Sequence, residues 1–210
     1  MTKNADSARV LLDTAYTILG FDSGELVSTD AAPTDLTSEQ WIEKGDWLSL
    51  AKKVGAEKVF FVDNNPVIVF AGHETDDVNI LRQAFNNTWC MARPMLLFLA
   101  RSGELAVYNL THPPIKTADE WHKSKPNLVL NVVNSVVEVA ATLHAYRREQ
   151  VESGRLFEDE RFGKPEQRAD QSLIRDLKTV RAELIQAGLG GDKLKYAHAL
   201  IGRSIFIRYL

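Results

Sequence analysis

The stretch Lys58–Leu110 decides the fold. It reads KVFFVDNNPVIVFAG over 58–72, DDVNILRQAFNNTWCMA over 76–92 and RPMLLFLARSGELAVYNL over 93–110. The first and third parts are dense in β-branched and aromatic residues around a short polar turn, which is the pattern of a β-hairpin. The middle part has an apolar stripe at helical spacing, Val78, Leu81, Phe85 and Trp89. Two apolar hairpins around one amphipathic helix predict an α/β (α+β) fold with a mixed sheet of four or more strands.

The turns inside this stretch support the two hairpins. Asp63-Asn64-Asn65-Pro66 and Ser102-Gly103 carry residues that tolerate turn conformations, and Pro66 can begin a strand because it need not donate there. The strands are almost continuously apolar, so we expect helices to cover both faces of the sheet.

The residues before this stretch predict two helices and a loop. Residues 5–19 have apolar residues at helical spacing and end before Gly20, which suits a helix C-terminus. Residues 21–38 are rich in Ser, Thr, Asp and Pro and indicate a loop. Thr37 or Ser38 can cap the next helix, which we expect to end before Gly55.

The second half of the chain is predicted to be helical. Residues 127–150 are β-branched enough to form a strand on propensity alone, but their unbroken length favours a helix packed on the sheet. A polar linker is expected over 153–167, and two more helices after it. The predicted domains are therefore an α/β domain, 1–120, and a helical connector, 121–210. Because the chain ends inside an apolar helical run, we expect it to be a piece of a larger protein.

Composition limits the function classes. The 210 residues hold 25 Lys and Arg against 28 Asp and Glu, with a pI of about 6.0, so a nucleic-acid contact would need a local basic patch. The single cysteine, Cys90, excludes a disulfide framework or a zinc cluster and is predicted to be buried. The N-terminus lacks the basic region and the long apolar run of a secretory signal, and no stretch has the apolar length of a membrane span. We therefore expect a cytoplasmic protein with no membrane partner.

Metal-dependent nuclease chemistry is the first catalytic possibility. It needs an Asp at the end of one strand, and an acid and a lysine two residues apart on the next, to hold Mg²⁺ and activate water. Asp63 is in the right place, but residues 67–71 contain neither an acid nor a lysine. We therefore predict no catalytic or metal-binding residue. If the chain is a nuclease, its acids would be Asp63 and Glu74 with Glu43 or Glu39 from the preceding helix.

Other chemistry has weaker signals. The five histidines lack acidic or nucleophilic partners at diagnostic spacings. The glycine-rich loop 188–192 follows a helix instead of a strand, so a helix end followed by a helix start explains it better than a phosphate-binding loop. Basic residues are more suggestive of DNA contacts, although acids are interleaved with several of them. The candidate DNA-binding residues are Arg147, Arg148, Lys164, Arg168, Arg203 and Arg208.

The last fifteen residues, YAHALIGRSIFIRYL (196–210), resemble the helix that precedes the catalytic domain in N6-adenine DNA methyltransferases of restriction-modification and phage-defence systems. The stretch 59–110 is similar in pattern to N-terminal, restriction-endonuclease-like domains of such proteins. The family's Asn/Asp-Pro-Pro-Tyr/Phe motif and its glycine-rich motif for S-adenosylmethionine are both missing; HPPI at 112–115 does not complete the former.

The resemblance implies a non-catalytic segment that positions DNA or a partner subunit. No cofactor is expected in this segment, and S-adenosylmethionine would belong to the parent enzyme. One alternative is the active nuclease described above. The other is a protein-interaction module without DNA binding, which could self-associate through residues 195–210.

Overall fold

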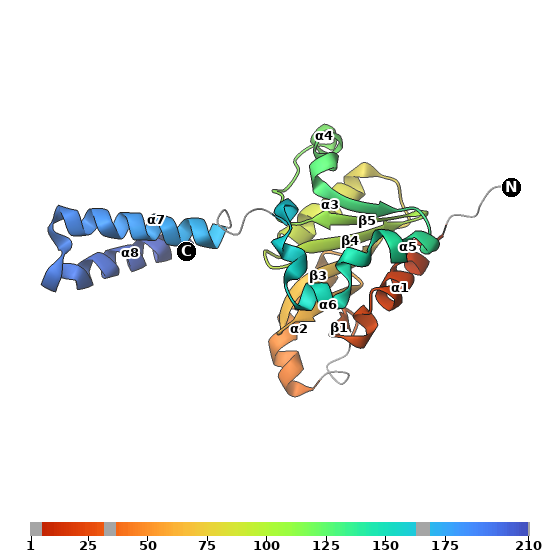
Figure 1. Cartoon of the computed structure of the whole chain (residues 1–210), viewed down its shortest axis with the longest axis horizontal. Helices are drawn as coiled ribbons and strands as arrows, with labels where there is room; N and C mark the ends of the chain where they lie inside the picture. The colour runs from red at the N-terminus through yellow and green to blue at the C-terminus, as the bar shows by residue number, and fades with distance from the viewer. Residues whose placement is uncertain (1–5, 32–36, 163–168, 210) are drawn as a thin grey trace. The chain divides into compact units, whose positions relative to one another are not determined.

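The computed structural model describes residues 6–31, 37–162 and 169–209 (Figure 1). The chain divides into two units, which we call the α/β unit, Met1–Phe162, and the helical unit, Gly163–Leu210. The predicted boundary near residue 120 is wrong, since it falls inside helix α4 (Ala118–Leu128) and separates that helix from a strand of the same sheet.

The α/β unit is built on one sheet of six strands in the order β1-β2-β3-β4-β5-β6. Both predicted hairpins belong to it. The central pair, β3 and β4, is parallel, and every other neighbouring pair is antiparallel. Helix α3 (Val78–Trp89) makes the crossover between β3 and β4. The strands are Leu26–Ser28, Lys58–Val62, Asn65–Gly72, Leu96–Arg101, Glu104–Asn109 and Val129–Val133.

The hairpin turns use the residues that the sequence indicated. Between β2 and β3, Asp63 and Asn64 both adopt positive φ, 47° and 63°, which short polar side chains tolerate best among non-glycine residues. Between β4 and β5, Gly103 has φ 73°. These two-residue loops fix the strand registers, so the apolar side chains alternate between the two faces of the sheet.

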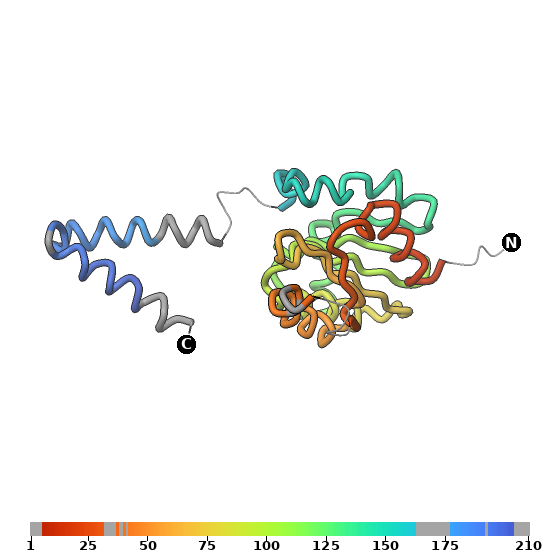
Figure 2. Tube along the Cα trace, turned by 90° about the horizontal axis from the view of Figure 1, so that it is seen from below, coloured from red at the N-terminus to blue at the C-terminus, as the bar shows by residue number. Residues whose placement is uncertain are grey.

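Each face of the sheet has its own apolar core, as predicted. Helix α1 (Ala8–Ile18) and helix α5 (Val136–Thr142) lie on one face, where Phe21, Phe70 and Phe98 form a cluster of ring contacts. Helices α2 (Ser38–Lys53), α3 and α4 cover the other face. The result is a three-layer arrangement of helices, sheet and helices (Figure 2).

The helix boundaries at the N-terminal end agree with the predictions. Ser7 caps α1, whose end is followed by Gly20 at φ 77°. Thr37 caps α2 with its hydroxyl on the Gln40 amide, while the Gln40 side chain accepts from the Thr37 amide, so both orphan donors are satisfied. Gly55 at φ 83° follows the end of α2.

The predicted helix over 127–150 is wrong. Its first part is β6, which pairs with β5, and only then does α5 begin. The strand ends before Asn134 and Ser135, and three short helical segments follow. They are α5, the 3-10 turn His144–Tyr146, and α6 (Arg148–Glu152). The β-branched residues Val129, Val132 and Val133 follow their intrinsic preference because an open sheet edge lies beside them.

Three further expectations fail. The predicted loop 21–38 contains the short edge strand β1. The predicted linker 153–167 contributes two 3-10 turns, Arg155–Glu158 and Glu160–Phe162, whose Leu156 and Phe162 are buried in the core. Cys90, predicted to be buried, is exposed because it lies at the C-terminal cap of α3.

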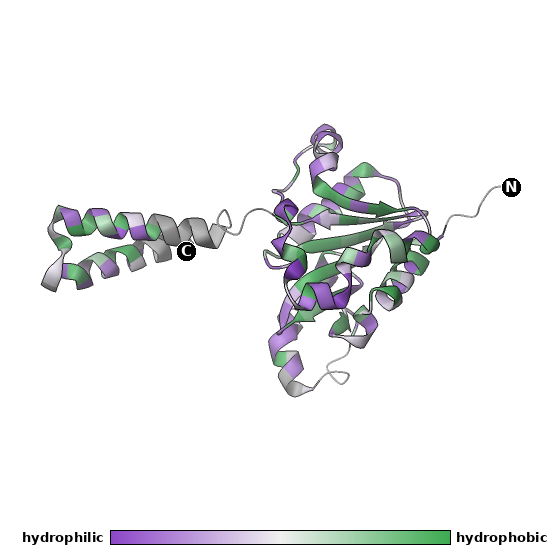
Figure 3. Cartoon of the chain, viewed as in Figure 1, coloured by the Kyte–Doolittle hydropathy of each residue, from purple (hydrophilic) through white to green (hydrophobic). Residues whose placement is uncertain are grey.

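The helical unit contains α7 (Ala169–Leu184) and α8 (Leu194–Tyr209), joined by a turn in which Gly188 has φ 98°. Arg181 of α7 donates to Nε2 of His198 on α8 at 3.1 Å. Hydrophilic and apolar residues alternate along the described parts of both helices (Figure 3). Ala197 is fully buried, whereas Tyr196 remains 58% exposed. None of the helices that the structure describes is long and apolar enough to span a bilayer.

Candidate functional site

The acids of the nuclease alternative lie at opposite ends of one strand. Asp63 is the first residue of the two-residue turn before β3, and Glu74 is the second residue after the strand ends. An eight-residue strand at about 3.3 Å per residue places them roughly 25 Å apart. Metal ligands must all lie within about 2.6 Å of one ion. Asp63 and Glu74 therefore cannot share a catalytic metal in this fold.

Glu74 has a structural role. Its Oε1 accepts a hydrogen bond from the backbone amide of Ala8 at 2.7 Å, at the first residue of α1. A carboxylate at a helix N-terminus is stabilised by the unpaired amides there. Glu43 is an exposed residue of α2, and the side chain of Glu39 lies outside the described residues. In the parts of the chain with described side chains, no three His, Cys, Asp or Glu residues are grouped closely enough to hold a metal ion.

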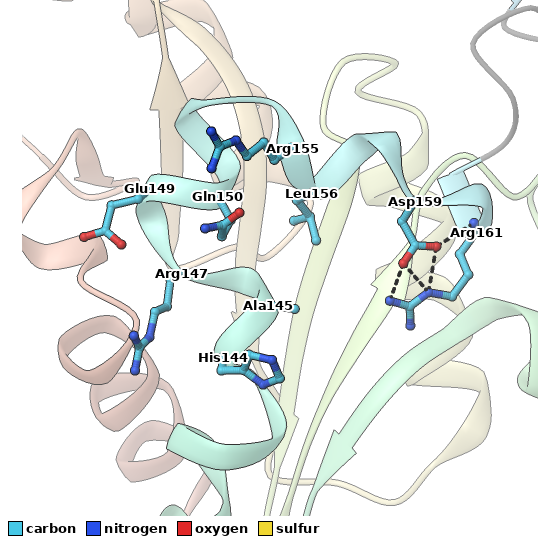
Figure 4. Close-up of a pocket in the computed structure, with 9 residues that line it drawn as sticks. All are labelled: His144, Ala145, Arg147, Glu149, Gln150, Arg155, Leu156, Asp159 and Arg161. Carbon is cyan, nitrogen blue, oxygen red and sulfur yellow. Dashed lines mark hydrogen bonds and ion pairs between the residues drawn. The ribbon is translucent and has the colours of Figure 1, made fainter.

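A hollow with a basic lining lies on the α/β unit, formed by the segment 144–161 (Figure 4). We call it the arginine hollow. Its volume is about 430 Å³, and it is lined by His144, Ala145, Arg147, Glu149, Gln150, Arg155, Leu156, Asp159 and Arg161. All nine come from one continuous series of short helical turns that packs on the α1 face of the sheet.

Long-range hydrogen bonds hold this segment in place. The buried Tyr146 hydroxyl donates to Oδ1 of Asn131 on β6 at 2.6 Å, and burial raises the pKa of Tyr146 to about 12, so the hydroxyl keeps its proton. Asn109 at the end of β5 donates to the carbonyl of Arg161 at 2.7 Å. The walls of the arginine hollow are therefore fixed to the sheet at both ends.

The charges of the arginine hollow divide into one engaged pair and two available cations. Arg161 makes a forked interaction with Asp159, 2.9 Å between Nη2 and Oδ2, and its hydrogen bonds hold the pKa of Asp159 below its ordinary value. Among the residues that the structure describes, neither Arg147 nor Arg155 has an ion-pair partner. Both are exposed at the rim.

The other predicted DNA-binding residues meet different outcomes. Arg148 is engaged in the fold: its Nη1 donates to the carbonyl of Ser23 at 2.8 Å, and its backbone amide donates to Leu19. Lys164 and Arg168 lie outside the described residues. Arg203 is exposed on α8. Arg208 belongs to the same helix, but its side chain is outside the described residues.

The two units carry opposite charge. Residues 163–210 hold nine Lys and Arg against five Asp and Glu, a formal charge of +4. Residues 1–162 hold sixteen against 23, a charge of −7, which together account for the −3 of the chain. Where the structure describes the side chains of the helical unit, five cations are exposed: Lys178, Arg181, Lys193, Lys195 and Arg203. A count over the whole sequence hides this separation, whereas a count per unit reveals it.

Sequence reasoning also missed His144 and Arg161 in the arginine hollow. His144 opens the 3-10 turn directly before Arg147, whereas Arg161 is separated from Arg147 by α6 and the turn Arg155–Glu158, so no single period connects the three. No protein-family model, curated protein or solved structure matches this chain significantly. Its function has to be argued from its own residues.

Proposed function

We propose that this chain is a non-catalytic, DNA-positioning segment of a DNA-modifying defence protein, and that its helical unit makes the DNA contacts. The observation that carries the proposal is the separation of charge, +4 on the helical unit against −7 on the α/β unit. Duplex DNA is attracted to clustered Lys and Arg and repelled by a net acidic surface. The helical unit is therefore the part of the chain that suits a phosphate backbone.

The described side chains of α8 support such a contact. Lys195, Tyr196 and Arg203 are all exposed. Tyr196 and Arg203 are seven residues apart, which places them on one face of the helix. Lysine and arginine bind phosphate oxygens, and a tyrosine hydroxyl can donate to them as well. Such contacts position a protein on DNA without reading its sequence.

The α/β unit supplies the framework in this proposal. Two hairpins around α3 share one sheet, with a parallel pair at its centre, which is compatible with the expected restriction-endonuclease-like arrangement. The separation of Asp63 from Glu74 argues against cleavage by the acids considered for it. The function that remains is to hold the helical unit and a partner subunit or domain.

The parent class rests on the resemblance of residues 196–210 to the helix preceding N6-adenine methyltransferase domains. S-adenosylmethionine would supply the methyl group in such a parent. Residues 73–77, which connect β3 to α3, contain no glycine of the kind that lets a cofactor approach the backbone at such a connection. We therefore assign that cofactor to other parts of the parent.

The test is binding of the chain to a fluorescent 25-base-pair duplex across a salt series, read by anisotropy. If four exposed cations contact phosphates, the slope of log K against log salt is about −3.6, and affinity falls roughly 100-fold between 50 and 200 mM salt. Replacing Lys195 and Arg203 by Gln removes two of these cations and should reduce the slope by about 1.8.

The matched control replaces Lys53 and Lys123 by Gln. Both are exposed helix residues, but they belong to the acidic α/β unit. This variant has the same change in total charge and should leave the slope unchanged. Equal losses in the two double variants would show that only net charge matters and would contradict a DNA contact on the helical unit.

A protein-interaction module is the second candidate. Val180 on α7 and Tyr196 on α8 are 43% and 58% exposed, and only Ala197 is fully buried among the described side chains of the helical unit. A pair of helices with this little burial gains stability by packing against another surface. A monomeric mass by light scattering, together with DNA binding at 50 mM salt, would favour the first candidate. A stable dimer without DNA binding would favour the second.

A further inference from the structure

We infer that the arginine hollow binds the phosphate group of a small phosphate ester, of about nucleotide size, at a site separate from the proposed DNA contact. Its arginines belong to the acidic α/β unit and are not part of the basic helical unit. The inference therefore does not depend on whether the helical unit binds DNA.

The two available guanidinium groups provide the affinity for an anion. Arg147 and Arg155 line the hollow from the residue that begins α6 and from the turn that follows it (Figure 4). Guanidinium groups donate in a planar fork that matches the oxygens of phosphate. Glu149 lies on the same lining and repels anions, so a bound phosphate has to contact an arginine directly to offset this repulsion.

The engaged pair gives the hollow a defined wall. The forked contact between Arg161 and Asp159 orients the Arg161 guanidinium, and the backbone carbonyl of Arg161 is held by Asn109. The Arg161 guanidinium also lies within hydrogen-bonding reach of the Tyr146 hydroxyl. Arg161 therefore adds positive charge to the wall, while Arg147 and Arg155 are the groups that would bind the phosphate.

The size and chemistry of the lining indicate more than a bare ion. A volume of about 430 Å³ falls in the range of small-molecule sites. Ala145 and the buried Leu156 supply apolar surface, while Gln150 supplies an amide that donates and accepts. This combination suits an organic group attached to the phosphate, with the amide fixing its orientation.

The electrostatics of the α/β unit favour a small ligand over a nucleic-acid backbone at this site. A charge of −7 on the unit repels a long polyanion along its whole length. A single phosphate is sensitive mainly to charges within about 8 Å at physiological ionic strength. The lining holds three arginines against Glu149 and Asp159, a net formal charge of +1, so a phosphate monoester is attracted there more than duplex DNA is.

The experiment is NMR titration of the whole chain with inorganic phosphate, adenosine 5′-monophosphate and adenosine, following the amides of residues 144–161. We expect saturable shifts with phosphate and tighter binding of the nucleotide, and none with adenosine. Arg155→Gln should weaken nucleotide binding at least tenfold, and Arg147→Gln should do the same. Arg9→Gln is the control, since Arg9 is an exposed cation on α1 with an 85% exposed side chain.

The outcomes that would overturn the inference are distinct. Equal shifts with adenosine and its monophosphate would show that the phosphate is not recognised. An equal loss of nucleotide affinity in Arg9→Gln would show that the effect comes from net charge alone. If a 25-base-pair duplex shifts the amides of 144–161 and competes with the nucleotide, the site belongs to DNA. Shifts from duplex DNA confined to 178–203 would leave this site separate from the proposed DNA contact.

Discussion

The buried ion pair between Lys44 and Glu25 gives the sharpest stability prediction. The Lys44 side chain is only 1% exposed, and its Nζ lies 3.0 Å from Glu25 and 5.4 Å from the centre of the Phe61 ring. The Glu25 side chain is 47% exposed. Removing Glu25 and removing Lys44 should therefore destabilise the fold by different amounts.

Removing Glu25 leaves a buried ammonium without its carboxylate. Loss of one partner from a fully buried pair costs about 3–5 kcal/mol, and we reduce this to about 2 kcal/mol for Glu25→Ala because water reaches the Glu25 side of the pair. Lys44→Met keeps an apolar side chain against Phe61 and leaves a carboxylate that solvent can hydrate, so we expect about 0.5 kcal/mol. The double variant should resemble Lys44→Met.

The assay is thermal and urea unfolding followed by tryptophan fluorescence, because all four tryptophans of the chain belong to the α/β unit. For a domain of this size, 2 kcal/mol corresponds to a Tm decrease of about 4–8 °C. A Glu25→Ala variant as stable as Lys44→Met would refute the reasoning, since it would mean that the ammonium is solvated.

Two other predictions concern local geometry and pH. Ala92, exposed after α3, has φ 62°, a left-handed conformation that costs a non-glycine residue about 1–2 kcal/mol. Glycine removes this strain, but the greater entropy of its unfolded chain cancels part of the gain, so Ala92→Gly should raise the free energy of unfolding by about 0.5 kcal/mol in urea titrations. Hydrogen bonds from Arg161 lower the pKa of Asp159, so this carboxylate stabilises the fold above its unfolded pKa and loses that effect as pH falls through the lower folded value. In Arg161→Ala the pKa of Asp159 should rise toward its ordinary value, which carboxyl-carbon NMR measures; an unchanged pKa would assign the shift to another group.

Local chemistry made much of the α/β unit predictable. The hairpin turns at Asp63-Asn64 and Ser102-Gly103, and the cap at Thr37, depend on residues within a few positions of one another. Such features follow from side-chain chemistry without knowledge of the tertiary structure. The apolar strands on both sides of these turns predicted a sheet covered on both faces, and the two cores confirm it.

The failures occur where tertiary contacts decide the outcome. Residues 129–133 have enough β-branched side chains for a strand, but only the free edge of β5 makes that strand form. Residues 26–28 form β1 because they pair with the edge of β2, although the residues on both sides of them are mostly polar. Leu156 and Phe162 are among the few apolar residues of a charged segment and follow no helical or strand period, so the sequence pattern did not show that they anchor it.

The roles of the site residues also depend on tertiary contacts that the sequence pattern does not show. Arg148 was predicted to contact DNA, and Glu74 was a candidate acid only in the nuclease alternative. Their hydrogen bonds to Ser23 and Ala8 give both residues structural roles. The placement of Arg147, Arg155 and Arg161 along the lining of one hollow requires several turns without a common period. Their sequence spacing alone contains no sign of it.

The central claim is that DNA contacts belong to the helical unit. The measurement that tests it most directly is the salt dependence of duplex binding, compared between the Lys195→Gln, Arg203→Gln double variant and the unmodified chain. Our account predicts that the slope of log K against log salt becomes smaller in magnitude by about 1.8, and that the Lys53→Gln, Lys123→Gln control keeps the slope of the unmodified chain. An unchanged slope in the helical-unit variant, or no binding by the unmodified chain at 50 mM salt, would contradict it.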